Sequence, residues 1–202
     1  FINNESNQPF SKEALRITDI ITIDDSLYIA TFDGLWRFFP HENLLERLPL
    51  PTTSNLLLKL RYHDGILYIG SDFEGLILYD IERKVIIEQI KNNLSSTEVT
   101  DIMPLDDGNV WLTTANGVHI YNRFSKSLKN VDISLKNKPV SLVFINEKMF
   151  ISTMGDGIFI FNKEGELLSK IAPNIEFNRS EIIEGEIWIS ATAGLYRINP
   201  EN

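Results

Sequence analysis

A pair of short strands around a glycine recurs five times along these 202 residues. The recurrence predicts an all-β fold, a β-propeller of about five four-stranded blades. Three observations carry this prediction: the glycines lie 41, 42, 40 and 37 residues apart, the residues around them agree in chemistry, and further strand-like segments flank each pair. A β-helix or a leucine-rich solenoid would need a shorter repeat of about 20 to 30 residues, so we reject both.

Each pair of strands is predicted to form a β-hairpin, and the five turns contain Gly34, Gly75, Gly117, Gly157 and Gly194. The strand before the turn carries an aromatic, an aliphatic and a small residue: Tyr28-Ile29-Ala30, Tyr68-Ile69-Gly70, Trp111-Leu112-Thr113, Phe150-Ile151-Ser152 and Trp188-Ile189-Ser190. The small residue would let a neighbouring sheet approach closely. We expect the glycine to supply backbone angles that other residues rarely adopt in a tight turn.

Two more strands complete each repeat. A first strand is predicted before each hairpin, at 17–24, 56–63, 99–106, 139–146 and, more weakly, 180–184. A fourth is predicted after it, at 44–48, 85–90, 128–131 and 167–171. Turn residues such as Asp64-Gly65 and Asp107-Gly108 join the first strand to the hairpin.

The repeats divide the chain into an N-terminal segment at 1–14 and five blades at 15–50, 51–97, 98–138, 139–174 and 175–202. The fifth blade lacks a fourth strand of its own. Either the segment at 1–14 supplies a closing strand for a five-bladed ring, or the five blades belong to a larger, seven-bladed propeller. We expect the second arrangement.

The composition excludes several classes of function. A net charge of −9, with no cluster of Lys and Arg, argues against binding to nucleic acid. No apolar run approaches the roughly 20 residues that span a bilayer, so we expect no membrane contact by this segment itself. The absence of cysteine excludes disulfides and thiolate metal sites.

The sequence contains no assembled catalytic or metal-binding motif. His41, His63 and His119 are isolated from one another, so no metal site is indicated, and we expect His119 to serve in packing or in a hydrogen bond on a strand face. No Ser-His-Asp set can be assembled from the sequence, and no cofactor motif is present. We therefore predict no catalytic residues.

The hairpin turns are the places to look for a ligand, because they open on the same face as the connections between blades and should converge on a central funnel. Their candidate ligand-binding residues are Phe32, Asp33, Asp72, Phe73, Glu74, Asn116, Met154 and Asp156. Carboxylates and an amide could form hydrogen bonds with the hydroxyls of a sugar, and exposed aromatic rings could pack against its apolar faces. The alternative is that Asp and Asn are present because they tolerate turn conformations.

The segments at 25–40, 99–122 and 185–200 (DSLYIATFDGLWRFFP, VTDIMPLDDGNVWLTTANGVHIYN and GEIWISATAGLYRINP) resemble the two-component regulator propeller repeat. The resemblance covers nearly the whole chain. It implies the extracytoplasmic sensor region of a membrane-bound, hybrid two-component histidine kinase. In that family such regions often belong to bacteria that use complex glycans.

The leading hypothesis is therefore a non-catalytic, periplasmic sensor region, with a small molecule or an oligosaccharide as the ligand. Neighbouring blades, other receptor domains and a second copy of the parent receptor are the expected protein partners. One alternative is a propeller glycoside hydrolase or lyase that uses Asp33, Asp72, Glu74 and Asp156. The other is a scaffold that binds proteins through a broad apolar patch.

Overall fold

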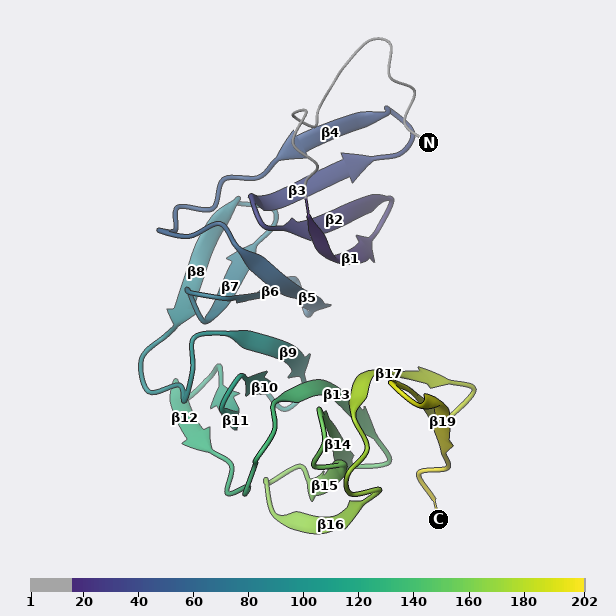
Figure 1. The fold of residues 1–202 in the computed structure, drawn as a ribbon. Helices are drawn as coiled ribbons and strands as arrows, with labels where there is room; N and C mark the ends of the chain where they lie inside the picture. Colours follow the sequence, from purple (N-terminus) through teal and green to yellow (C-terminus); the bar gives the residue numbers. More distant parts are fainter. Residues whose placement is uncertain (1–15, 202) are drawn as a thin grey trace. The chain divides into compact units, whose positions relative to one another are not determined.

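The computed structural model describes residues 16–201, and every regular element in that range is a β-strand. The strands form five antiparallel sheets, and each sheet is built from strands that follow one another in the chain (Figure 1). The prediction of an all-β chain with five sheets is confirmed. The candidate closing strand at 1–14 lies outside the described residues.

Within the described part of the chain, residues 16–90 and 91–201 form two compact units. The first unit contains two sheets. One comprises β1 (Ile17–Ile23), β2 (Ser26–Thr31), β3 (Gly34–Phe39) and β4 (Leu44–Arg47). The other comprises β5 (Leu57–His63), β6 (Ile66–Ser71), β7 (Leu76–Asp80) and β8 (Val85–Ile90).

The second unit contains three sheets. Its first comprises β9 (Val99–Pro104), β10 (Asn109–Thr114), β11 (Gly117–Asn122) and β12 (Ser127–Asn130). Its second comprises β13 (Pro139–Ile145), β14 (Lys148–Thr153), β15 (Ile158–Asn162) and β16 (Leu167–Ile171). Its third comprises β17 (Phe177–Ile183), β18 (Glu186–Ala191) and β19 (Gly194–Ile198), with no fourth strand among the described residues.

Within each unit, neighbouring sheets bury apolar side chains against each other. In the first unit, Tyr28 and Leu35 share a core with Leu60 and Leu67 of the next sheet. Two similar cores join the sheets of the second unit. Because both faces of a central strand are covered, β6, β10 and β14 are buried along almost their whole length.

The strand β17 is longer than the sequence indicated, since it begins at Phe177 instead of residue 180. The polar stretch Asn178-Arg179 hides its start in the sequence. Phe177 is nevertheless buried, and its ring packs edge-on against Tyr196 at a centroid distance of 5.4 Å. This tertiary contact extends the strand beyond its apolar residues.

The expected role of the repeated glycine is correct at four turns and wrong at one. Gly34, Gly75, Gly157 and Gly194 have positive φ angles, but Gly117 is absent from the left-handed region. A Cβ atom at Gly117 would lie 2.5 Å from Ser95 Oγ. At this turn, glycine is therefore required by a close contact and not by its backbone angles.

Candidate ligand site

In all five sheets, the hairpin turn lies beside the connection that precedes the same sheet. A backbone amide of each turn donates a hydrogen bond to a carbonyl of that connection, over distances of 2.9 to 3.1 Å. The five pairs are Phe32 to Arg16, Asp72 to Leu56, Ala115 to Glu98, Met154 to Lys138 and Thr192 to Glu176. The turns and connections therefore share one edge of each sheet.

In the first unit, the predicted site residues fall into two groups. Phe32, Asp33 and Phe73 are exposed at the turn tips, and Asp33 forms an exposed ion pair with Arg47. Glu74 is buried, and Asp72 is half-buried. The Glu74 carboxylate accepts hydrogen bonds from the Thr53 hydroxyl, the Ser54 amide (3.2 Å) and Gln89 Nε2 (2.8 Å).

In the second unit, Asn116 and Met154 are exposed, whereas Asp156 is buried. Asp156 Oδ2 accepts hydrogen bonds from the backbone amides of Lys136 (2.8 Å) and Asn137 (2.7 Å). Glu74 and Asp156 thus fasten the preceding connection to its hairpin turn. Their positions as ligand-binding residues remain a prediction.

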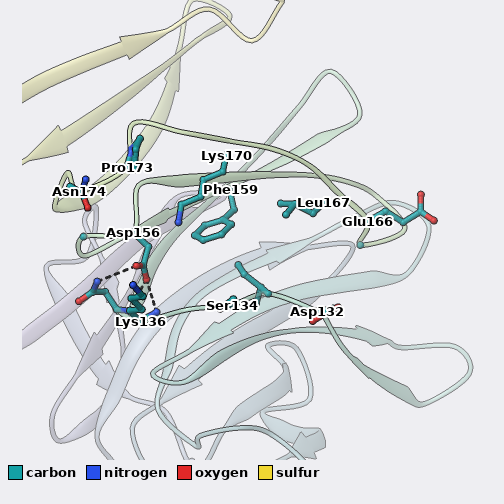
Figure 2. A pocket seen from close by; sticks show the side chains of 14 residues that line it. Asp132, Ser134, Lys136, Asp156, Phe159, Glu166, Leu167, Lys170, Pro173 and Asn174 are labelled. Atoms are coloured by element: carbon teal, nitrogen blue, oxygen red, sulfur yellow. Dashed lines mark hydrogen bonds between the residues drawn. The ribbon is translucent and has the colours of Figure 1, made fainter.

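A groove with a volume of about 800 Å³ runs along the second sheet of the second unit. The connection 132–137, the turn at Gly155-Asp156, the strands β15 and β16 and the loop at Pro173-Asn174 line it. Figure 2 shows Asp156 and Asn174 toward one end of the groove and Glu166 at the other. Of the predicted site residues, only Asp156 lines this groove.

Lys170 and Phe159 form the middle of the groove. The Lys170 ammonium group lies over the Phe159 ring, 4.4 Å from its centroid (Figure 2). Burial by itself would raise the pKa of Asp156, but the hydrogen bonds from Asn137 and Lys136, together with the Lys170 charge, lower it below its ordinary value. Asp156 is therefore ionised at neutral pH.

The charges that line the groove are mixed. Three carboxylates (Asp132, Asp156 and Glu166) and two ammonium groups (Lys136 and Lys170) face it, together with the amides of Asn137 and Asn174. A highly charged ligand of either sign would meet repulsion at one of these groups. The lining suits a neutral molecule with many hydroxyl groups or a zwitterion.

Sequence reasoning missed Lys170, Phe159 and Asn137. A usable signal existed for Phe159, because its place in the repeat varies between blades: Trp36, Ile77, His119, Phe159 and Tyr196. Lys170 pairs directly with Phe159 on the neighbouring strand. No comparable signal marks Asn137, which the fold brings from a separate connection.

His119 takes part in a chain of hydrogen bonds, in agreement with the expectation that it serves in packing or in a hydrogen bond on a strand face. Its Nε2 lies 2.9 Å from Ser95 Oγ and accepts a hydrogen bond from the Ser95 amide (3.1 Å), while Nδ1 lies 2.7 Å from Asn130 Oδ1. The Ser95 hydroxyl also contacts Thr114 Oγ1 at 2.9 Å. The chain fastens the connection at Ser95 to its hairpin, as Glu74 and Asp156 do elsewhere.

The His119 contact makes a pH dependence of stability predictable. Burial lowers the pKa of His119, and the hydrogen bond with Asn130 opposes this shift only partly. A lowered pKa means that the unfolded chain binds the proton more tightly, so stability is lost as the pH falls below about 6.5. Protonation would also remove the acceptor for the Ser95 amide.

We expect the free energy of unfolding, measured by urea titration, to fall between pH 7.5 and 5.5. The expected loss of unfolding free energy is about 1.4 kcal/mol for each pH unit by which the pKa of His119 in the folded chain lies below its pKa in the unfolded chain. The variant His119→Gln should flatten this part of the profile, whereas His41→Gln, at an exposed position, should leave it unchanged. An unchanged slope in His119→Gln would assign the pH dependence to another group.

Within residues 16–201, no group of three or more His, Asp or Glu side chains is arranged to hold a metal ion. The same range contains no helix that is long and apolar enough to cross a membrane.

No family model and no curated protein matches the sequence. Solved structures match the fold at low sequence identity. The WD40 β-propeller domain of Doa1 matches with a TM-score of 0.72 and 13% identity, over 88% of this chain and 61% of that one. The fold is a β-propeller.

Structures of two extracellular domains from B. thetaiotaomicron also match. The extracellular domain of BT4673, described as a one-component and as a hybrid two-component system, matches with TM-scores of 0.81 and 0.79 and 17% identity. The match covers 97% and 96% of this chain and 28% of that domain. The extracellular domain of the hybrid two-component system BT3049 matches with a TM-score of 0.73 and 18% identity, over 91% of this chain and 27% of that one.

Proposed function

We propose that this propeller segment is part of the extracytoplasmic sensor region of a two-component signalling receptor, and that it recognises its ligand without catalysis. The observation that carries the proposal is a fold shared, over 97% of this chain, with the extracellular domain of BT4673. The repeat motifs at 25–40, 99–122 and 185–200 point independently to the same kind of receptor. Because fold alone does not determine function, the ligand must be argued from the site.

The ligand that the groove suits best is a glycan. Its carboxylates and amides can accept and donate hydrogen bonds to hydroxyl groups, and the buried Phe159 ring holds the Lys170 ammonium group in place as a further donor. A volume of about 800 Å³ is large enough for a short oligosaccharide. The exposed rings of Phe32 and Phe73 lie in the other unit and are a separate candidate contact.

A glycoside hydrolase or lyase has weaker support. Glu74 and Asp156 are buried, and their oxygens accept hydrogen bonds from the protein itself. An ionised Asp156 with a lowered pKa would also make a poor general acid. The remaining alternative is a scaffold that binds proteins, and the binding experiment described below distinguishes it from a ligand sensor.

Isothermal titration with a panel of neutral and charged oligosaccharides tests the proposal. We expect at least one neutral oligosaccharide to bind, and Lys170→Ala to weaken its binding about tenfold or more, since a charge-assisted hydrogen bond contributes roughly 1.5–3 kcal/mol. Lys126→Ala removes the same charge from an exposed position of the same unit outside the groove and should leave the affinity unchanged.

Two results would count against the proposal. If no oligosaccharide binds, the glycan assignment fails. If one binds equally to the wild type and to Lys170→Ala, the groove is not the site. Capture of a protein partner that is indifferent to all small ligands would favour the scaffold.

A further inference from the structure

The connection that precedes β9 brings a serine hydroxyl onto a buried imidazole. Ser95 Oγ lies 2.9 Å from Nε2 of His119, and the same nitrogen accepts a hydrogen bond from the Ser95 amide at 3.1 Å. His119 is 1% exposed, whereas Ser95 is exposed on the connection. Both residues belong to the second unit. A nucleophile and a base therefore meet at this edge of the sheet, although 24 positions separate them in the sequence.

The hydrogen bonds determine the tautomer of His119. A backbone amide can only donate, so Nε2 carries no proton when it accepts the Ser95 amide. The imidazole proton is therefore on Nδ1, which donates it to Asn130 Oδ1 at 2.7 Å. The lone pair of Nε2 faces the Ser95 hydroxyl, as general-base activation of a serine requires. Asn130 holds the ring in this tautomer and orientation.

Fastening a connection to its hairpin does not by itself require a histidine. Asp156 does so with a carboxylate that accepts two backbone amides. In the sheet of β9 to β12 the acceptor is an imidazole, which is a stronger base than a carboxylate, and Asn130 holds its second nitrogen. Strand pairing places Asn130 opposite His119, as it places Lys170 opposite Phe159 in the groove. This sheet thus carries an oriented base where the next one carries the middle of the groove.

The hairpin turn places further groups around the Ser95 hydroxyl. Thr114 Oγ1 lies 2.9 Å from Ser95 Oγ and can donate to it while the serine proton is directed at Nε2. Asn116 is exposed, and its Nδ2 lies 3.5 Å from the Ser95 carbonyl oxygen, so an amide donor lies beside the place where an oxyanion would develop. A Cβ atom at Gly117 would lie 2.5 Å from Ser95 Oγ, so glycine makes room for the hydroxyl.

We propose that Ser95 is an activated nucleophile that takes up the acyl group of a small ester, with His119 as its general base. The Ser95 oxygen attacks the carbonyl carbon of the ester, and the serine proton passes to His119 Nε2. When the tetrahedral intermediate collapses, the bond to the alcohol oxygen breaks, and the alcohol leaves with the proton from His119. The acyl group stays on Ser95 Oγ. This reaction is independent of ligand recognition in the groove at Phe159 and Lys170.

An alkyl fluorophosphonate tests the proposal, because a serine that is activated by an adjacent base displaces fluoride from its phosphorus atom. We expect the 202-residue chain to gain a phosphonyl group at Ser95 about a hundred times faster than at Ser96, as measured by mass spectrometry of peptides. Ser96 is a matched control within the same connection, because its hydroxyl accepts the Glu98 amide (3.2 Å) and does not face an imidazole.

The variant His119→Gln should slow the labelling of Ser95 about a hundredfold, since this is the order of magnitude that a general base contributes. Ser96→Ala should leave the rate unchanged. Labelling of Ser95 that is no faster than that of Ser96 would overturn the proposal, and so would a rate that His119→Gln does not change.

The pH profile of the wild type keeps the test decisive if circular dichroism shows that His119→Gln does not fold. The rate of labelling should be constant between about pH 8 and 7 and should fall below about pH 6.5, where His119 begins to be protonated. Asn130→Ala should slow the labelling and move this fall to lower pH, because the hydrogen bond from Asn130 raises the pKa of His119. A rate that rises in proportion to hydroxide over the whole range would overturn the proposal.

Discussion

Replacing Gly157 with alanine will lower the free energy of unfolding of the second unit by about 2–5 kcal/mol. Gly157 has a φ of +88°, and a Cβ atom there would lie 2.4 Å from the carbonyl oxygen of Ile171 and 2.6 Å from that of Ala172. Ile171 pairs with Ile158 in the same sheet, so its backbone cannot retreat without disturbing the pairing of β15 with β16. The energetic cost of left-handed backbone strain and the cost of overpacking therefore add up in this variant. Urea unfolding, followed by tryptophan fluorescence, measures the loss.

The variant Gly185→Ala separates the cost of left-handed backbone strain from the cost of overpacking. Gly185 has a φ of +79°, yet a Cβ atom there would meet nothing within 4 Å. We expect this variant to lose only the left-handed strain, about 1–2 kcal/mol. Equal losses in the two variants would show that the contact with Ile171 and Ala172 is not the cause.

Replacing Asp101 with alanine will destabilise the second unit by about 3–5 kcal/mol, because hydrogen bonds to a buried charged group contribute roughly 1.5–3 kcal/mol each. Asp101 is buried, and its two oxygens accept the amides of Ile102 (2.9 Å) and Leu142 (2.9 Å). The amide of Leu142 belongs to the following sheet. Alanine would remove the acceptor that joins the two sheets at this point. The same urea titration measures the effect.

Asp101→Ser is the informative companion, because serine occupies the same position of the next sheet. Ser141 Oγ accepts the Ser180 amide at 3.0 Å, so a hydroxyl can serve at such a junction. We expect serine to recover about 1 kcal/mol or more of the stability that alanine loses. If serine is as destabilising as alanine, the junction hydrogen bond does not explain the effect of Asp101.

Much of the fold was predictable because hairpins are local. The aromatic, aliphatic and small residues recur in the same order before each glycine, and a hairpin needs only contacts between residues a few positions apart. The start of strand β17 was not predicted, because Phe177 is separated from the apolar run by Asn178 and Arg179. Its burial depends on Tyr196, which lies in another strand.

The candidate site was predictable only in part. The expectation that hairpin turns and blade connections share an edge is correct, as the five amide contacts show. The groove itself is assembled from the connection 132–137, β15 and β16, and no local pattern shows that Asn137 meets Asp156 or that Lys170 lies over Phe159. Side chains on separate elements are brought together by packing, which the repeat does not specify.

The repeated glycines illustrate the division between local and long-range information. The amino-acid sequence is sufficient to place five hairpins and their turns, because turn geometry limits which residues can stand at Gly34, Gly157 or Gly194. It does not distinguish Gly117, which is glycine because Ser95 of a distant connection occupies the space of a Cβ atom. Likewise, the complete burial of Leu35 is decided by the following sheet, because Leu57 and Leu60 of that sheet share its core.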